Sequence, residues 1–182
     1  EADLARGCRR GDARAWREMV RRFSPLVYRL AYGMLRSESE AEDATQETFL
    51  RMHRSFDTFD PTRPMTPWVA RTAYNVCLRR LEPAGRRLVT GAEPEELEAL
   101  EDPAGTSPEG EAARREAIGL LARALAELPA QDRALLDLRY REGLSDAEVA
   151  EATGMPVNTV KTRIFRARGR LRAWLAPLLG GP

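Results

Sequence analysis

Apolar residues recur at spacings of three and four along most of the chain, which is the pattern of amphipathic helices. Sustained alternation of apolar and polar residues, the pattern of a half-buried strand, is missing from the sequence. Asn-Gly and Asp-Gly pairs, which would mark hairpin turns, are missing too. The sequence therefore predicts an all-α fold.

The first part of the chain is expected to form a small helical domain over residues 1–82. Asp12 and Ser39 are predicted to cap two of its helices, and proline suits the first turn of the helix that begins at Pro25. In the first helix Trp16, Met19, Val20 and Phe23 should face inward. The predicted helices are 13–23, 25–36, 40–56 and Trp68–Leu81, with a proline-rich loop over Asp57–Pro67.

The composition changes at the end of this domain. Residues 83–111 are rich in proline, glycine and glutamate and poor in large apolar side chains, which is typical of a flexible, self-repelling linker. A second small domain is predicted over 112–182. Its predicted helices are 112–128, 130–143, 145–154 and 156–179. Two of them are joined by "TGMP", and Ser145 and Glu148 stand at capping-box spacing, which indicates a helix-turn-helix.

Net charge is divided unevenly along the 182 residues, although the total is only +1. Residues 1–81 hold 15 arginines and 11 acids, residues 82–111 hold 2 arginines and 9 acids, and residues 112–182 hold 12 basic residues and 8 acids. Two basic domains thus flank an acidic segment, which favours an anionic partner for the domains.

Several classes of protein are disfavoured by the sequence. Apolar runs are too short to cross a membrane. Cys8 and Cys77 lack the spacing of a metal site or redox motif, which favours reduced thiols, a cytoplasmic location and no metal. Glycine-rich phosphate loops and nucleophile motifs are missing as well, so neither a cofactor nor an enzymatic activity is expected.

The last predicted helix combines an apolar stripe with an exposed face whose charged residues are all positive. Its core stripe is Val160, Ile164, Ala167, Leu171, Trp174 and Leu178. The sequence contains no acid after Glu151, whereas Lys161 and five arginines follow. Such a helix suits the DNA major groove, where cations neutralise phosphates and N-terminal side chains reach base edges. The alternative is a basic helix that binds nothing.

The predicted helix Trp68–Leu81 carries a second candidate surface. Trp68, Arg71, Asn75 and Arg79 lie on one face, with Tyr74 beside them. Aromatic rings can stack on unpaired bases, arginine can hold the backbone and asparagine can bond a base edge. Trp68 and Tyr74 can equally be partly buried core residues, and the sequence alone leaves both interpretations open.

The helix "EAEDATQETFLRMHRSF" raises a third question. Ala41, Ala44, Thr48, Met52 and Phe56 form its core face, and the opposite face carries acids, an amide and Leu50. That face can be a solvated surface, a metal or catalytic cluster, or a docking site. A helical di-iron pair needs Glu-x-x-His, and His53 stands six residues after Glu47, so a metal site fits poorly.

Both predicted domains resemble one family, the extracytoplasmic-function type of alternative sigma factor of bacterial RNA polymerase. The segment "AEDATQETFLR" is similar to the helix with which these proteins bind core polymerase, and "PWVARTAYN" to the helix that handles the −10 promoter element. The segment "TVKTRIFRAR" is similar to the helix that reads the −35 element. One departure is Arg79, which stands where the family often has Asp.

The resemblance implies a promoter-specificity subunit that binds core RNA polymerase and promoter DNA and has an anti-sigma factor as a further partner. It implies three sets of residues. The residues for core polymerase are Asp43, Gln46, Glu47 and Leu50. Those for the −10 element are Trp68, Arg71, Tyr74, Asn75 and Arg79. Those for the −35 element are Asn158, Thr159, Lys161, Thr162, Arg163, Phe165 and Arg166. It also implies that the acidic linker threads the RNA channel of the polymerase; a passive tether is the alternative.

The alternative function is a helix-turn-helix transcriptional regulator that acts without core polymerase. Such regulators usually carry an αβ receiver or a ligand-sensing domain in front. The helical pattern of the first domain argues against this.

Overall fold

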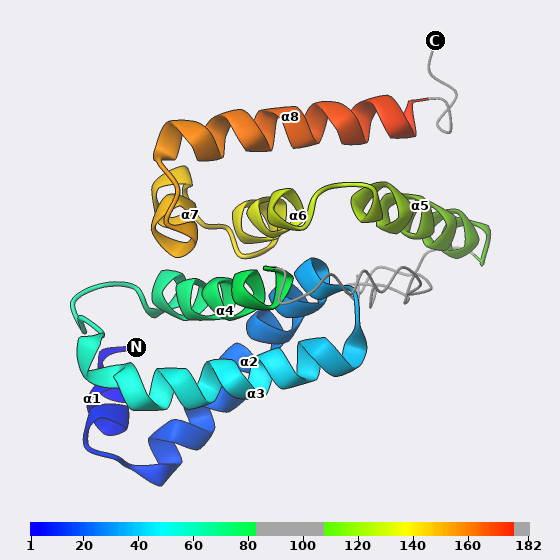
Figure 1. Ribbon diagram of the computed structural model, residues 1–182. Coiled ribbons are helices and arrows are strands. Elements are labelled where there is room, and N and C mark those ends of the chain that lie inside the picture. Colours follow the sequence, from blue (N-terminus) through cyan, green and yellow to red (C-terminus); the bar gives the residue numbers. More distant parts are fainter. Residues whose placement is uncertain (83–107, 177–182) are drawn as a thin grey trace.

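The computed structural model describes residues 1–82 and 108–176, and within these ranges all regular structure is helical, which confirms the all-α prediction (Figure 1). The linker predicted over 83–111 lies mostly outside the described residues. The elements are α1 (Ala2–Arg9), α2 (Ala13–Leu35), α3 (Glu38–Ser55), a 3₁₀ turn (Phe56–Thr58), α4 (Met65–Leu81), α5 (Pro108–Ala126), α6 (Ala130–Leu136), a π turn (Asp137–Arg141), α7 (Asp146–Thr153) and α8 (Val157–Leu175).

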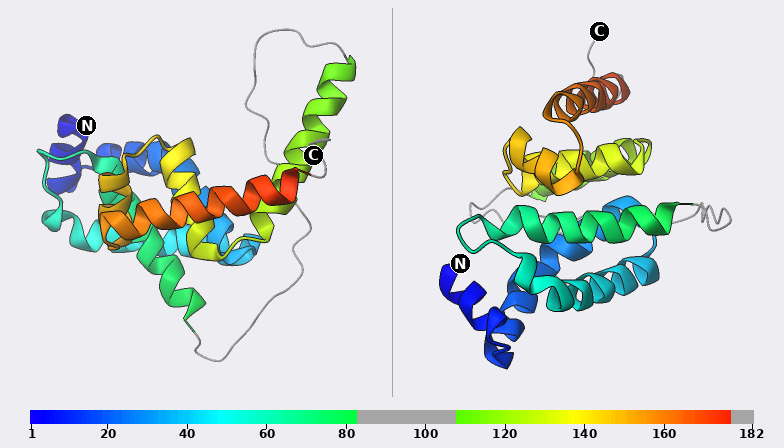
Figure 2. Two further views of the ribbon diagram at one scale, coloured as in Figure 1. Left: turned by 90° about the horizontal axis from the view of Figure 1, so that it is seen from above. Right: turned by 60° about the vertical axis from the view of Figure 1, so that its left-hand side comes forward.

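The helices form successive layers. The first group of helices is α1–α4, and the second group is α5–α8. Helices α2 and α3 lie on one side of α4, and the second group lies on its other side, with α8 as the outermost layer (Figures 1 and 2). The first group is held by large buried side chains of α2, α3 and α4, namely Met19, Val27, Leu30, Met34, Met52, Met65, Val69 and Val76. The second group is centred on Leu135, Leu138, Val149 and Val160.

Helix α2 runs without a break through Pro25, so the prediction of two separate helices was wrong. Proline cannot donate a backbone hydrogen bond, and the Ser24 hydroxyl bonds to the Val20 carbonyl at 2.7 Å in the turn before it. The buried residues Met19, Phe23, Leu26 and Val27 continue at helical spacing across the proline. Burial of this continuous stripe outweighs the loss of one hydrogen bond. Val20, expected inside, is 39% exposed.

Helix α1 was not predicted, because the residues that it buries are small. They are Ala5, Gly7 and Cys8. Gly7 allows a close approach to α2, since a Cβ there would lie 2.6 Å from the Cβ of Ala15. Asp12 caps α2 as predicted, accepting from the Arg14 N–H at 2.8 Å. Ser37, and not Ser39, is the N-cap of α3.

The segment before α4 is shorter than the predicted loop. A 3₁₀ turn covers Phe56–Thr58, and α4 begins at Met65, so that Pro67 lies in its first turn, where a missing N–H is harmless. Asp60 shapes the remaining loop by accepting from the N–H and the hydroxyl of Thr62. This loop therefore has a defined conformation.

The second group of helices contains the predicted helix-turn-helix, formed by α7 and α8. Ser145 and Glu148 make the predicted capping box at the start of α7. Gly154 ends α7 with φ 72°, the left-handed conformation that glycine adopts without strain. Helix α5 begins at Pro108, four residues before the predicted start of the second domain at 112.

Candidate functional site

The start of α8 presents a polar and cationic face that is open to solvent. Its exposed residues are Asn158, Thr159, Lys161, Thr162, Phe165 and Arg166. The Phe165 ring is 78% exposed, the most exposed large apolar side chain among the described residues. A shallow pocket of about 320 Å³ lies at this end of the helix, between Asn158, Thr159, Thr162, Arg163 and Arg166. Val160, Ile164 and Ala167, on the opposite side of the helix, are buried.

Arg163 differs from the other candidates on α8. Its guanidinium donates to the Asp132 carboxylate at 2.7 Å and to the Gln131 side-chain oxygen at 2.6 Å, both on α6. These bonds hold α8 against α6. The sequence could not show this, since Asp132 lies 31 positions earlier.

The candidate surface on α4 is divided in two by packing. Asn75 and Arg79 are exposed, whereas Tyr74 is only 1% exposed. Burial raises the pKa of the Tyr74 hydroxyl, which also lies near Arg163 and Asp132 of the second group. Trp68 is half-buried, with its ring centroid 5.5 Å from that of Phe56 and 5.2 Å from that of Phe59. In this arrangement Tyr74 is a core residue, and Trp68 packs against the core.

Residues of α3 extend the exposed part of this surface. A pocket of about 360 Å³ opens between α3 and α4, lined by Arg51, Arg54, Ser55, Thr72, Asn75 and Arg79. Arg54 and Arg79 make no ion pair within the described part of the chain. The pocket therefore holds two unpaired guanidinium groups and the side-chain amide of Asn75. Arg51, Arg54 and Ser55 could not be predicted for this surface, because only the antiparallel packing of α3 on α4 brings them beside Asn75. Thr72 lies one turn before Asn75 on α4, where helical spacing could have identified it.

The predicted docking face of α3 contains exposed and bonded side chains. Asp43, Gln46 and Leu50 are exposed, and Leu50 is 58% exposed. Glu47 instead accepts from Arg51 at 2.5 Å and from Arg80 of α4 at 2.9 Å. Burial acts to raise the pKa of Glu47, but the hydrogen bonds from Arg80 and Arg51 outweigh it and lower that pKa. Glu47 thus connects α3 to α4.

Among the described residues, no group of His, Cys, Asp and Glu side chains is arranged to hold a metal ion. Cys8 and Cys77 are free and buried, and burial raises the pKa of their thiols to about 11 and about 12. A search of the same residues finds no helix that is long and apolar enough to span a membrane.

A basic helix-turn-helix, carried beside a helical domain with its own cationic pocket, defines a DNA-binding protein of two helical parts. Residues 19–87 match the family described as Sigma-70 region 2, and residues 118–171 match Sigma-70, region 4. The chain is 33% identical over 175 residues to the ECF RNA polymerase sigma factor SigW of Bacillus subtilis, covering 93% of this chain and 94% of that protein. It is also 33% identical over 186 residues to the RNA polymerase sigma-H factor of Pseudomonas aeruginosa, covering 98% and 95%.

A solved structure of CnrH in complex with the cytosolic domain of CnrY aligns with a TM-score of 0.67 and 25% identity, covering 97% of this chain and 99% of that one. The chain belongs to the ECF sigma factors of RNA polymerase. It therefore directs core polymerase to specific promoters, and the alternative of a regulator that acts without polymerase is not favoured.

The contacts of Glu47 generate a prediction about stability. Glu47→Ala should lower the free energy of unfolding by about 1 kcal/mol, because it removes the shared partner of Arg51 and Arg80. Gln46→Ala, the neighbouring exposed control, should change it by less than about 0.5 kcal/mol. Urea denaturation followed by circular dichroism measures both. Equal stabilities would show that this network does not hold α3 to α4.

Proposed function

We propose that the two helical parts divide promoter recognition between them, with the second reading the −35 duplex and the first capturing unpaired bases of the −10 element. The observation that carries this proposal is the exposed, acid-free face at the start of α8, which follows a helix-turn-helix. Asn158, Thr159, Lys161, Thr162, Phe165 and Arg166 are its proposed contacts. Arg163 is the positioning residue behind them.

For the −10 element we place the contacts in the pocket between α3 and α4. Arg54 and Arg79 would hold backbone phosphates, and Asn75 would bond a base edge. Arg71 lies on the same helix and would add a further phosphate contact. Capture of unpaired bases offsets the unfavourable free energy of unstacking them, so binding itself would favour melting. This mechanism requires neither a cofactor nor an enzymatic activity of the chain.

For core polymerase we propose the exposed patch Asp43, Gln46 and Leu50. An apolar side chain surrounded by polar groups is a common centre of a protein interface, where the apolar contact supplies affinity and the rim sets orientation. We further propose that the protein acts in the cytoplasm. An anti-sigma factor is a proposed partner too, supported by the CnrH relative, which was solved bound to another protein.

Reconstitution with core RNA polymerase tests the function as a whole. The chain should confer promoter-specific run-off transcription on core enzyme that has none without it. Leu50→Ala should weaken binding to core by about tenfold or more, because a central apolar contact is lost. Val20→Ala, an exposed apolar residue on α2, is the control. Equal binding of both variants would remove Leu50 from the interface.

Base reading by α8 is tested with two arginines of the same helix. Arg166→Ala should weaken holoenzyme binding to its promoter by about 1–3 kcal/mol, as expected for loss of a bidentate contact to guanine. Arg172→Ala, near the other end of α8, should weaken binding to all sequences alike. Competition with random duplex separates the two effects. An Arg166 variant that loses equal affinity for promoter and random DNA would contradict base reading.

The α3–α4 pocket makes a prediction about open complexes. Arg54→Ala and Asn75→Ala should reduce promoter opening more than they reduce formation of the closed complex, because both groups meet only the unpaired strand. Arg17→Ala, an exposed arginine on α2, should change neither step. Permanganate footprinting of unpaired thymines measures opening. Wild-type footprints in Arg54→Ala and Asn75→Ala would exclude the pocket.

A further inference from the structure

Five aromatic rings meet where α3 ends, and they connect α2 with α3, the 3₁₀ turn and α4. The ring centroid of Trp16, in the first turn of α2, lies 4.7 Å from that of His53 and 5.1 Å from that of Phe56. Phe56 and Phe59 both contact Trp68, with centroids 5.5 Å and 5.2 Å away. Aromatic rings at such distances attract one another beyond the effect of the area that they bury. These five residues form an aromatic cluster that holds the end of α3.

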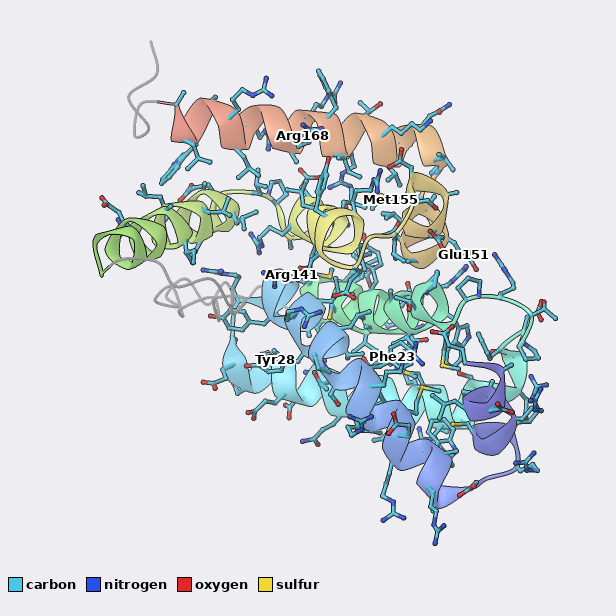
Figure 3. All side chains as sticks on the ribbon, turned by 180° about the vertical axis from the view of Figure 1, so that it is seen from behind. Phe23, Tyr28, Arg141, Glu151, Met155 and Arg168 are labelled. Atoms are coloured by element: carbon cyan, nitrogen blue, oxygen red, sulfur yellow. The ribbon has the colours of Figure 1, made fainter. Side chains whose placement is uncertain are left out.

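Helix α1 supports the same cluster from the outside. It lies beside the 3₁₀ turn that follows α3 (Figures 1 and 3). Arg9 of α1 donates to the Phe59 carbonyl at 2.6 Å, and the indole N–H of Trp16 donates to the Cys8 carbonyl at 3.1 Å. Helix α1 and Trp16 precede residue 19, where the match to Sigma-70 region 2 begins. These contacts therefore start from residues outside the matched part of the chain.

The last turn of α3 also carries residues of the α3–α4 pocket. Arg54 and Ser55 line that pocket and directly follow His53 in the sequence. Helix ends fray, because their last carbonyl groups have no partner within the helix. Buried Phe56 anchors the inner side of this turn, and the contact of His53 with Trp16 holds its exposed side. Since Arg54 makes no ion pair within the described ranges, its direction depends on the backbone that these rings hold.

We propose that Trp16 and His53 are positioning residues of the α3–α4 pocket, whose ring contact holds the last turn of α3 so that Arg54 faces Asn75. Neither ring touches DNA in this mechanism. The two residues act through Arg54, which they keep ready for the unpaired strand, and α1 keeps Trp16 in place. The inference rests on the proposed function for its effect on promoter opening, whereas its effect on α3 is measured without DNA.

Hydrogen exchange of backbone amides tests the ring contact on the free full-length chain. His53→Ala should raise the exchange rate of residues 52–56 by about three- to tenfold, the range expected for the loss of one aromatic pair. His53→Tyr keeps a ring at this position and should restore the wild-type rate. Glu42→Ala, at an exposed position in the first half of α3, is the control and should leave residues 52–56 unchanged. Because His53 is exposed, its replacement leaves the core intact, and circular dichroism verifies the fold of each variant.

Permanganate footprinting of the holoenzyme tests the link to promoter opening. Trp16→Ala and His53→Ala should each reduce opening by about three- to tenfold, with little change in formation of the closed complex. His53→Tyr should open promoters as the wild type does. In a chain that already carries Arg54→Ala, the further change His53→Ala should have almost no effect, because the group through which His53 acts is gone. A general loss of stability would instead reduce opening by the same factor in both chains.

The outcomes separate the inference from the function on which it rests. Faster exchange in His53→Ala that His53→Tyr reverses, together with footprints that are not additive with Arg54→Ala, would support the positioning role. Equal exchange of His53→Ala and the wild type in residues 52–56, or a full loss of opening on top of Arg54→Ala, would overturn it. Wild-type footprints in Arg54→Ala alone would overturn the −10 function and the positioning role with it, even where the exchange result holds.

Discussion

Packing on both sides of α4 is the constraint on which the rest of the structure depends. Val69, Ala70, Ala73, Val76 and Cys77 are almost fully buried, which fixes the rotation of the helix about its axis. With that rotation fixed, Asn75 and Arg79 must point outward and Tyr74 must point toward the second domain. Helix α3 packs on α4, and its own arginines complete the pocket beside Asn75.

Arginine has several roles in this protein, and the bonding partners of each arginine determine its role. Arg80 and Arg51 share Glu47 and join two helices, Arg163 holds α8 to α6, and Arg133 bonds the last carbonyls of α2. Arg54 and Arg79 lack such partners within the described ranges and face an open pocket. The net charge of each domain therefore overstates its capacity to bind DNA, since part of the positive charge is used in folding.

The fold was largely predictable because long apolar stripes and the capping box are local signals. Helix α1 was not predicted because its buried side chains are small. The continuity of α2 through Pro25 depends on tertiary burial, which outweighs the local preference of proline for the start of a helix. The candidate site was predictable only in outline. Spacing on one helix predicted Asn75 and Arg79 on one face. The neighbouring Arg54 and Ser55 of α3, and the internal bonds of Glu47 and Arg163, depend on contacts between elements.

The contacts between the two parts are of two kinds. They combine a shared apolar core with ion pairs that remain partly exposed, such as Arg63 with Glu151. An exposed ion pair contributes only about 0–1 kcal/mol, and contacts between domains within one chain resemble transient complexes. The ion pairs therefore contribute little to holding the two parts together, and the apolar packing that keeps Tyr74 out of water contributes more.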